Sequence, residues 1–71
     1  MTPIEKWKLL QKEASKYPKY LRYGQCLMNA LQKIDLPIYT RIAGTNADCF
    51  YDDEKSADFA IMVMDLWYGT E

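Results

Sequence analysis

The sequence contains no histidine among its 71 residues. Histidine is the side chain that most often serves as a general base near neutral pH and as a metal ligand. The two cysteines, Cys26 and Cys49, lie far apart in the chain and do not form a recognised zinc motif. The acidic stretch that begins at Asn46 does not follow the calcium-loop pattern, because Phe50 stands at the third ligand position and Tyr51 where that pattern requires glycine. We therefore expect no metal, no cofactor, no catalytic residue and no enzymatic activity.

Long hydrophobic runs are also missing. The longest one, Phe59–Met64, has six residues, whereas a helix that spans a bilayer needs about 20. Pro3 and the charged residues after it interrupt the start of the chain, so we expect no signal peptide. Two cysteines are few for a small secreted protein, which usually depends on several disulfides. The sequence predicts a cytoplasmic protein that keeps its thiols reduced and does not contact a membrane.

Hydrophobic and aromatic residues are plentiful. They include six Tyr, two Phe and two Trp, and 49% of the chain is hydrophobic. Large aromatic side chains bury much area, which favours a compact core. A chain of 71 residues is expected to form a single helical domain, residues 1–71. A core of this size is small, and such domains often need a partner subunit or a cross-link for stability.

Charge is distributed unevenly between the two halves of the chain. Residues 1–33 carry seven Lys or Arg against two Glu, whereas residues 34–71 carry two Lys or Arg against eight acidic residues. Opposite charges of this kind attract each other within one fold or between subunits, which is the interpretation we favour. The alternative is a basic surface for an anionic partner.

The segment Tyr20–Ile34 has the clearest helical pattern. Its large apolar residues recur at intervals of three, four and seven, which places them on one face of a helix. Gly24 lies on the same face, where a missing side chain allows another backbone to come close. We expect the other segments to pack around this helix.

Start and stop signals mark three further helices. Thr2 and Glu5 form a capping-box pattern at the start of the first helix, which Pro18 ends. Pro37–Ala43 is expected to be a short helix followed by a terminating glycine. The last helix is expected to run from residue 52 or 53 to about residue 68. The sequence therefore predicts an all-α fold, a small bundle of three long helices plus one short helix around one layered core.

Residues 37–51 also fit a second interpretation. The isoleucines, tyrosine and threonine of residues 38–42 favour a strand. Gly44–Asp48 would then be a turn, and Cys49-Phe50-Tyr51 the partner strand. In the helical interpretation Gly44 ends the short helix and Gly44–Asp53 is a loop. The choice between a helix with a loop and a short hairpin stays open at this point.

The last expected helix is apolar on every side over Phe59–Met64. A helix of this kind is usually buried on every side, and a four-helix domain of this length rarely surrounds one helix completely. We therefore expect part of it to contact another molecule, most simply a second copy in a dimer. The expected interface residues are Phe59, Met62, Val63, Leu66 and Trp67.

A basic, tyrosine-rich region near the junction of the first two helices indicates an alternative function. Regularly spaced cations can follow phosphates, and tyrosines can stack on bases. This pattern would suit a nucleotide or a single-stranded nucleic acid, although an ordinary solvated surface also explains it. The candidate anion-binding residues are Lys12, Lys16, Lys19, Arg22 and Tyr23.

Two motifs resemble those of a family of very short phage and prophage proteins. The first motif has the form R-[FY]-G-Q-x-x-x-N-A-L, and the second is a D-x-F-Y-D loop. The matching residues are Arg22, Tyr23, Gly24, Gln25, Asn29, Asp48, Phe50, Tyr51 and Asp52. The family is functionally uncharacterised. The resemblance implies a small accessory protein in a bacterial cytoplasm, with no assigned activity. A host protein is a further partner in the interaction-module hypothesis.

The shared residues are expected to have a structural role. Arg22, Gln25 and Asn29 would reach from the second helix to the aspartates of the loop, with an Arg–carboxylate pair as the main contact. Cys49 stands where proline is commoner in the family, so this loop is expected to be less rigid. The favoured function is thus a non-enzymatic protein–protein interaction module that self-associates through its last helix.

Overall fold

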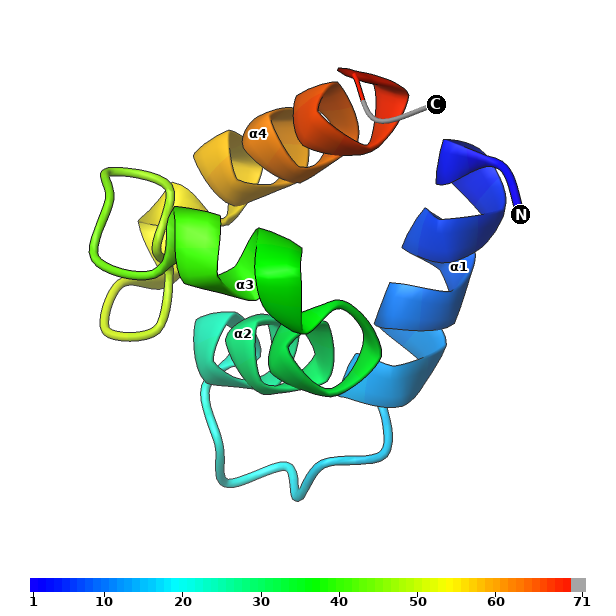
Figure 1. The fold of residues 1–71 in the computed structure, drawn as a ribbon. Helices are drawn as coiled ribbons and strands as arrows, with labels where there is room; N and C mark the ends of the chain where they lie inside the picture. Colours follow the sequence, from blue (N-terminus) through cyan, green and yellow to red (C-terminus); the bar gives the residue numbers. More distant parts are fainter. Residues whose placement is uncertain (70–71) are drawn as a thin grey trace.

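The computed structural model describes residues 1–69, and these residues form an all-α fold (Figure 1). The elements are α1 (Pro3–Ala14), α2 (Tyr23–Ile34), α3 (Leu36–Ile42), a short 3-10 helix η1 (Asp53–Lys55) and α4 (Ser56–Gly69). The expected all-α class is confirmed for this part of the chain. Residues 38–42 are helical and no strand occurs in residues 1–69, so the hairpin interpretation is excluded.

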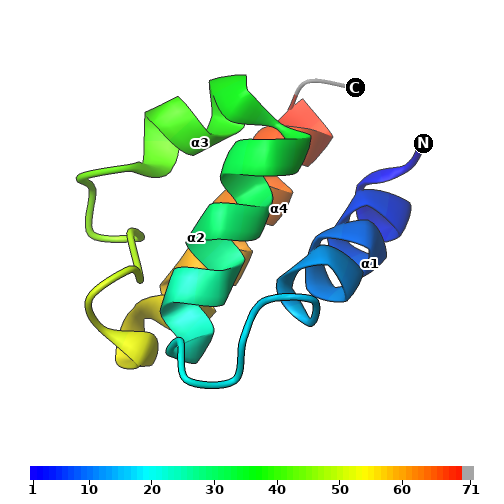
Figure 2. The same cartoon turned by 90° about the horizontal axis from the view of Figure 1, so that it is seen from below.

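Helix α2 lies at the centre of the arrangement. Figure 2 shows α1 on one side of it, α3 on the other and α4 behind it. Helices α2 and α4 run in the same direction, and α1 runs in the opposite one. One cluster of buried side chains fills the space between the helices. Its largest fully buried members are Trp67, Phe59, Leu10, Leu27, Met28, Leu31, Ile42, Val63 and Cys49.

The N-terminus of α1 has the expected capping box. The Glu5 backbone N–H donates to Thr2 Oγ1 at 3.2 Å, and the Thr2 N–H donates to the Glu5 carboxylate at 2.9 Å. The two bonds satisfy N–H groups that have no partner within the helix. The helix ends at Ala14, earlier than Pro18 implied, and residues 15–22 form a longer connection than expected.

Helix α2 begins at Tyr23 and not at Tyr20, which corrects the expected start. The Tyr20 side chain is 79% exposed and does not belong to the apolar face. The first turn is fixed at Arg22, whose backbone N–H donates to Gln25 Oε1 at 3.1 Å. Apolar spacing indicates which face of a helix is buried, but a cap of this kind decides where the helix starts.

Asp35 joins three helices. Its Oδ1 accepts a hydrogen bond from the Ile38 N–H at 3.3 Å, which caps α3. Its Oδ2 accepts from Trp67 Nε1 on α4 at 2.8 Å. Beyond the other end of α3, Gly44 has φ +81°, a conformation that side-chain-bearing residues rarely adopt. Gly44 is therefore the helix stop that the sequence indicated.

Candidate functional site

Helix α4 presents two different apolar faces. The first contains Phe59, Val63 and Trp67, which are 0%, 0% and 1% exposed because their own chain covers them. These three residues were expected to contact another molecule, and the structure corrects that expectation by placing them in the core. Met62 and Leu66, the other two residues of that set, are half-buried and pack against the core.

The second face of α4 points outward. Ile61 is 62% exposed and Tyr68 is 54% exposed, and the half-buried Met64 lies between them at helical spacing. Beside it on α1, Ile4 is 53% exposed and Trp7 is half-buried. A shallow groove of about 450 Å³ runs between the two helices and is lined by Trp7, Ala60, Ile61, Met64 and Asp65. We call Ile4, Trp7, Ile61, Met64 and Tyr68 the outer apolar face.

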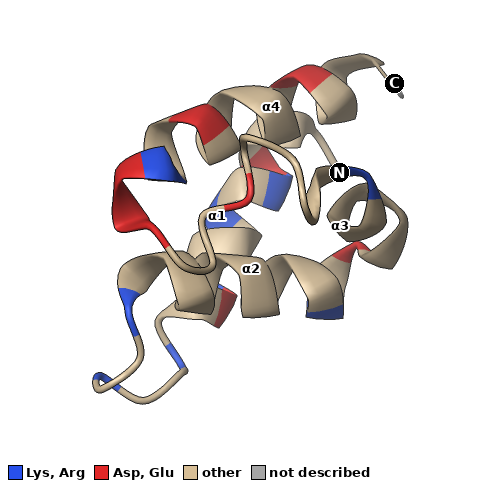
Figure 3. Cartoon of the chain, turned by 90° about the vertical axis from the view of Figure 1, so that its left-hand side faces the viewer, with Lys and Arg blue, Asp and Glu red and all other residues tan. Residues whose placement is uncertain are grey.

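The two helices beside this groove carry opposite charges. Helix α1 has Lys6, Lys8 and Lys12 against two glutamates, whereas α4 has Asp58 and Asp65 and no basic residue. Figure 3 shows red segments along α4, and both blue and red segments on α1. Among the described residues, Asp65 is the one charged residue that lines the groove itself. Lys6 lines a different, smaller cavity beside Trp67.

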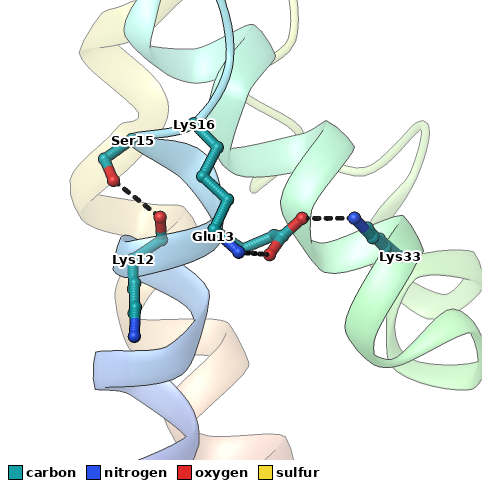
Figure 4. Close-up of polar contacts among 5 residues, drawn as sticks. All are labelled: Lys12, Glu13, Ser15, Lys16 and Lys33. Carbon is teal, nitrogen blue, oxygen red and sulfur yellow. Dashed lines mark hydrogen bonds and ion pairs between the residues drawn. The ribbon is translucent and has the colours of Figure 1, made fainter.

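Glu13 forms two ion pairs, and the one with Lys33 joins α1 to α2. It is only 8% exposed, and its carboxylate accepts from Lys33 Nζ at 2.7 Å and from Lys16 Nζ at 3.3 Å (Figure 4). The hydrogen bond from Lys33, together with the contact with Lys16, lowers the pKa of the Glu13 carboxyl below its ordinary value. Helix packing, and not substrate binding, accounts for this shift.

The lowered pKa makes stability depend on pH in a definite direction. Because folding favours the ionised Glu13, its contribution is present above the ordinary glutamate pKa and is lost as pH falls through the lower, folded-state value. We expect Glu13→Gln to be less stable than the wild type at pH 7. As the pH falls from 5 to 3, the variant is expected to lose less stability than the wild type does. Urea unfolding at several pH values measures this. If the free energy of unfolding falls equally with pH in the two proteins, the pH dependence does not come from Glu13.

The expected anion-binding residues do not all lie together. Lys16 pairs with Glu13, and Arg22 donates from Nη2 to the Phe50 carbonyl oxygen at 2.8 Å. Lys12 is exposed on α1 and lines none of the described cavities. Lys19 and Tyr23 do come together, on the wall of a cavity where α1, the connection and α2 meet. A continuous row of cations for a phosphate chain is therefore absent from residues 12–23.

Gly24, one of the shared motif residues, holds the 43–55 segment against the start of α2. The Gly24 N–H donates to Asp53 Oδ1 at 2.8 Å, and the Cys49 thiol lies 3.5 Å from the Gly24 carbonyl oxygen. A Cβ atom at Gly24 would overlap the carbonyl oxygen of Cys49. The close backbone approach expected at this glycine is confirmed.

The contacts that hold this segment differ in kind from the expected Arg–carboxylate pair. Arg22 binds the Phe50 carbonyl, not an aspartate. The Asp48 carboxylate accepts from the N–H groups of Gly44 and Phe50, at 2.8 and 3.0 Å, within the segment itself. Backbone groups are therefore the main hydrogen-bond partners of Arg22 and Asp48. The spacing of residue types in the sequence does not reveal partners of this kind.

The remaining motif residues have local roles. Gln25 caps α2, and Asp52 accepts from the Glu54 N–H at 3.0 Å to cap η1. Asn29 is half-buried on α2. Tyr51 is 82% exposed, and its ring meets that of Phe50 edge-on at 4.8 Å. None of these contacts gathers reactive groups around a cavity.

Three important acidic residues were not recognised as such from the sequence: Glu13, Asp35 and Asp53. Asp35 was treated as a helix breaker and Asp53 as an acid at a helix start. The position of Asp35 three residues before Ile38, typical of a side-chain cap, is the one signal that indicated a role. The long-range contacts of Glu13 with Lys33 and of Asp53 with Gly24 leave no local pattern.

The buried thiol of Cys49 is chemically quiet. Its burial, with smaller effects from Asp48 and Asp53, raises the pKa of the thiol to about 11. Thiolate is the nucleophilic form, so little of it is present at neutral pH. Within residues 1–69, no three metal-ligating side chains gather closely enough to hold a metal ion.

No helix in the described part of the chain combines the length and apolar character needed to span a bilayer. The cavity near Lys19 and the groove between α1 and α4 are the two largest of the three described cavities, at about 560 and 450 Å³. Searches against protein-family models, curated proteins and solved structures find no match to this chain.

Proposed function

We propose that this protein is a non-enzymatic interaction module that pairs with a second copy of itself through the outer apolar face. The observation that carries the proposal is the exposure of Ile61, at 62%, in the middle of a helix whose opposite face is buried in the core. Ile4 on α1 and Tyr68 on α4 are exposed apolar residues of the same two helices. Exposed apolar surface of this kind typically marks a protein–protein contact.

The opposite charges of α1 and α4 support a copy of the same chain as the partner. In a two-fold symmetric dimer, each surface patch meets its own counterpart in reverse. The lysines of α1 would then face the aspartates of α4 in the second copy. Lys8 and Asp65, both exposed, are the expected pair across the axis. Such complementarity sets the register of an interface more than its affinity.

The size of the chain indicates that both helices take part. A standard interface covers about 800 Å² per partner, and the described chain has an accessible surface of 4569 Å². One helix of 14 residues is about 21 Å long and about 10 Å wide, too narrow to supply this area. Helix α1 would therefore have to contribute beside α4.

The wider biological setting belongs to the same proposal. The motif resemblance supports a small phage or prophage accessory protein in a bacterial cytoplasm, with a host protein as a further partner. The pKa of about 11 at Cys49 supports a non-enzymatic role for this thiol, because little nucleophilic thiolate is present there at neutral pH.

Light scattering coupled to size-exclusion chromatography, run at several loading concentrations, tests the proposal. We expect wild-type protein to move from monomer to dimer with increasing concentration and Ile61→Asp to remain monomeric. Each buried isoleucine contributes about 1.5–3 kcal/mol, and a symmetric dimer contains it twice. The dimer dissociation constant is therefore expected to rise at least about 100-fold.

The matched control is Tyr51→Asp, which introduces the same charge at a site that is 82% exposed and lies outside the groove. We expect it to associate as the wild type does, and both variants to retain the wild-type circular dichroism. The proposal fails if wild-type protein stays monomeric at every concentration. It also fails if both variants weaken the dimer equally, because the contact would then lie elsewhere.

A further inference from the structure

We propose that the cavity between the end of α1, the 15–22 connection and the start of α2 binds a small aromatic anion. The cavity has a volume of about 560 Å³ and lies apart from the groove beside Ile61. This volume is in the range of small-molecule sites and suits a molecule of one or two rings. The proposal is independent of self-association through the outer apolar face.

The walls of the cavity are mainly apolar and aromatic. Tyr17 and Leu21 are half-buried along the connection, and Tyr23 contributes its ring from the first turn of α2. Cys26 lies deeper on α2 and is only 8% exposed. A flat ring system can contact tyrosine rings face to face or edge to face, and this gives it more contact area than a flexible polar ligand.

The connection beside the cavity is positively charged. The connection 15–22 carries Lys16, Lys19 and Arg22 and no acidic residue, and Figure 3 shows its blue segments without red between them. Lys19 lines the cavity and forms no ion pair within residues 1–69. The nearest acid along the chain, Glu13, is already neutralised by Lys33 and Lys16. An anionic group beside Lys19 is therefore attracted and meets little opposing charge.

The same contacts favour a small ligand over a nucleic-acid strand. A strand needs several available cations along a groove. Here Lys16 is held by Glu13 and Arg22 by the Phe50 carbonyl, which leaves Lys19 as the main cation at the cavity. A single available cation beside an apolar cavity suits a small ligand that carries one negative charge on an aromatic ring system.

Fluorescence titration with 1-anilinonaphthalene-8-sulfonate, an aromatic anion, tests the inference in Ile61→Asp protein, so that self-association does not interfere. We expect saturable 1:1 binding. Lys19→Glu is expected to weaken binding about tenfold, since it replaces an attraction of about 0.7 kcal/mol with a similar repulsion. The uncharged analogue N-phenyl-1-naphthylamine is expected to bind more weakly than the sulfonate and to be insensitive to Lys19→Glu.

Tyrosine variants provide a matched pair of controls. Tyr23 lines the cavity, whereas Tyr20, on the same connection, is 79% exposed and does not. We expect Tyr23→Ala to weaken binding severalfold and Tyr20→Ala to leave it unchanged. Equal effects of the two substitutions, or equal binding of the charged and uncharged probes, would overturn the proposal.

Alkylation of the cysteines with iodoacetamide gives a second, independent readout. Cys26 faces the cavity and Cys49 does not. The bound sulfonate is expected to slow alkylation of Cys26 and to leave that of Cys49 unchanged. Unchanged alkylation of Cys26 at saturating probe overturns the assignment to this cavity. Tight binding of a single-stranded oligonucleotide with no binding of the sulfonate would also overturn it, in favour of a nucleic-acid ligand.

Discussion

Replacement of Gly24 with alanine is expected to cost about 3 kcal/mol or more of folding stability. The added Cβ would overlap the Cys49 carbonyl oxygen and lie 2.9 Å from its carbonyl carbon and 3.0 Å from Asp53 Oδ1. Two of these atoms belong to the backbone, so no side-chain rotation relieves the overlap. The segment around Cys49 would have to move off α2, and the hydrogen bond from the Gly24 N–H to Asp53 would be lost.

Thermal unfolding followed by circular dichroism measures this loss. For a domain of this size, 3 kcal/mol corresponds to a fall in melting temperature of about 12–24 °C. The other two glycines are internal controls, because a Cβ at either one meets nothing within 4 Å. Gly44→Ala is expected to cost about 1 kcal/mol from its positive φ, and Gly69→Ala close to nothing. Similar effects at all three positions would contradict the close contact at Gly24.

Replacement of Asp35 with alanine is expected to cost about 2–3 kcal/mol. It removes the cap of α3, a contribution of about 1 kcal/mol, and the hydrogen bond from Trp67 Nε1. The second bond is part-buried, so its loss costs about 1–2 kcal/mol. The one carboxylate therefore fixes the end of α2, the start of α3 and the C-terminal part of α4 together.

Two conservative substitutions separate these contributions in urea unfolding experiments. Asp35→Asn retains a capping oxygen and is expected to lose less than half as much stability as Asp35→Ala. Trp67→Phe removes the indole N–H while keeping a large ring in the core. In Trp67→Phe protein, Asp35→Ala is expected to cost less stability than it does in the wild type. Fully additive effects of Trp67→Phe and Asp35→Ala would show that the hydrogen bond between them contributes nothing.

Features of the fold with a local cause could be predicted from the sequence. Thr2 and Glu5 mark the start of α1, and Gly44 follows the end of α3, because caps and turns act over a few residues. The close approach at Gly24 was also foreseen from its place on an apolar face. The start of α2 was misplaced at Tyr20, because the apolar spacing continues past the cap at Arg22.

The candidate site could be predicted only in outline. Helix α4 is apolar on nearly every side, so periodicity cannot tell which stripe faces the core. The stripe with Phe59, Val63 and Trp67 proved to be the buried one, and the stripe with Ile61 and Tyr68 the exposed one. That choice depends on where α1 and α3 pack, which is set by long-range contacts. The cavity near Lys19 likewise depends on the path of the 15–22 connection.

A dilution series of ¹H–¹⁵N correlation spectra tests the central claim, self-association through the outer apolar face, most directly. The account predicts concentration-dependent shifts for the amides of Ile61, Met64 and Tyr68 and for the indole of Trp7, with those of Ala47 unchanged. Spectra that do not change with concentration, or shifts confined to residues outside the α1–α4 groove, would contradict it.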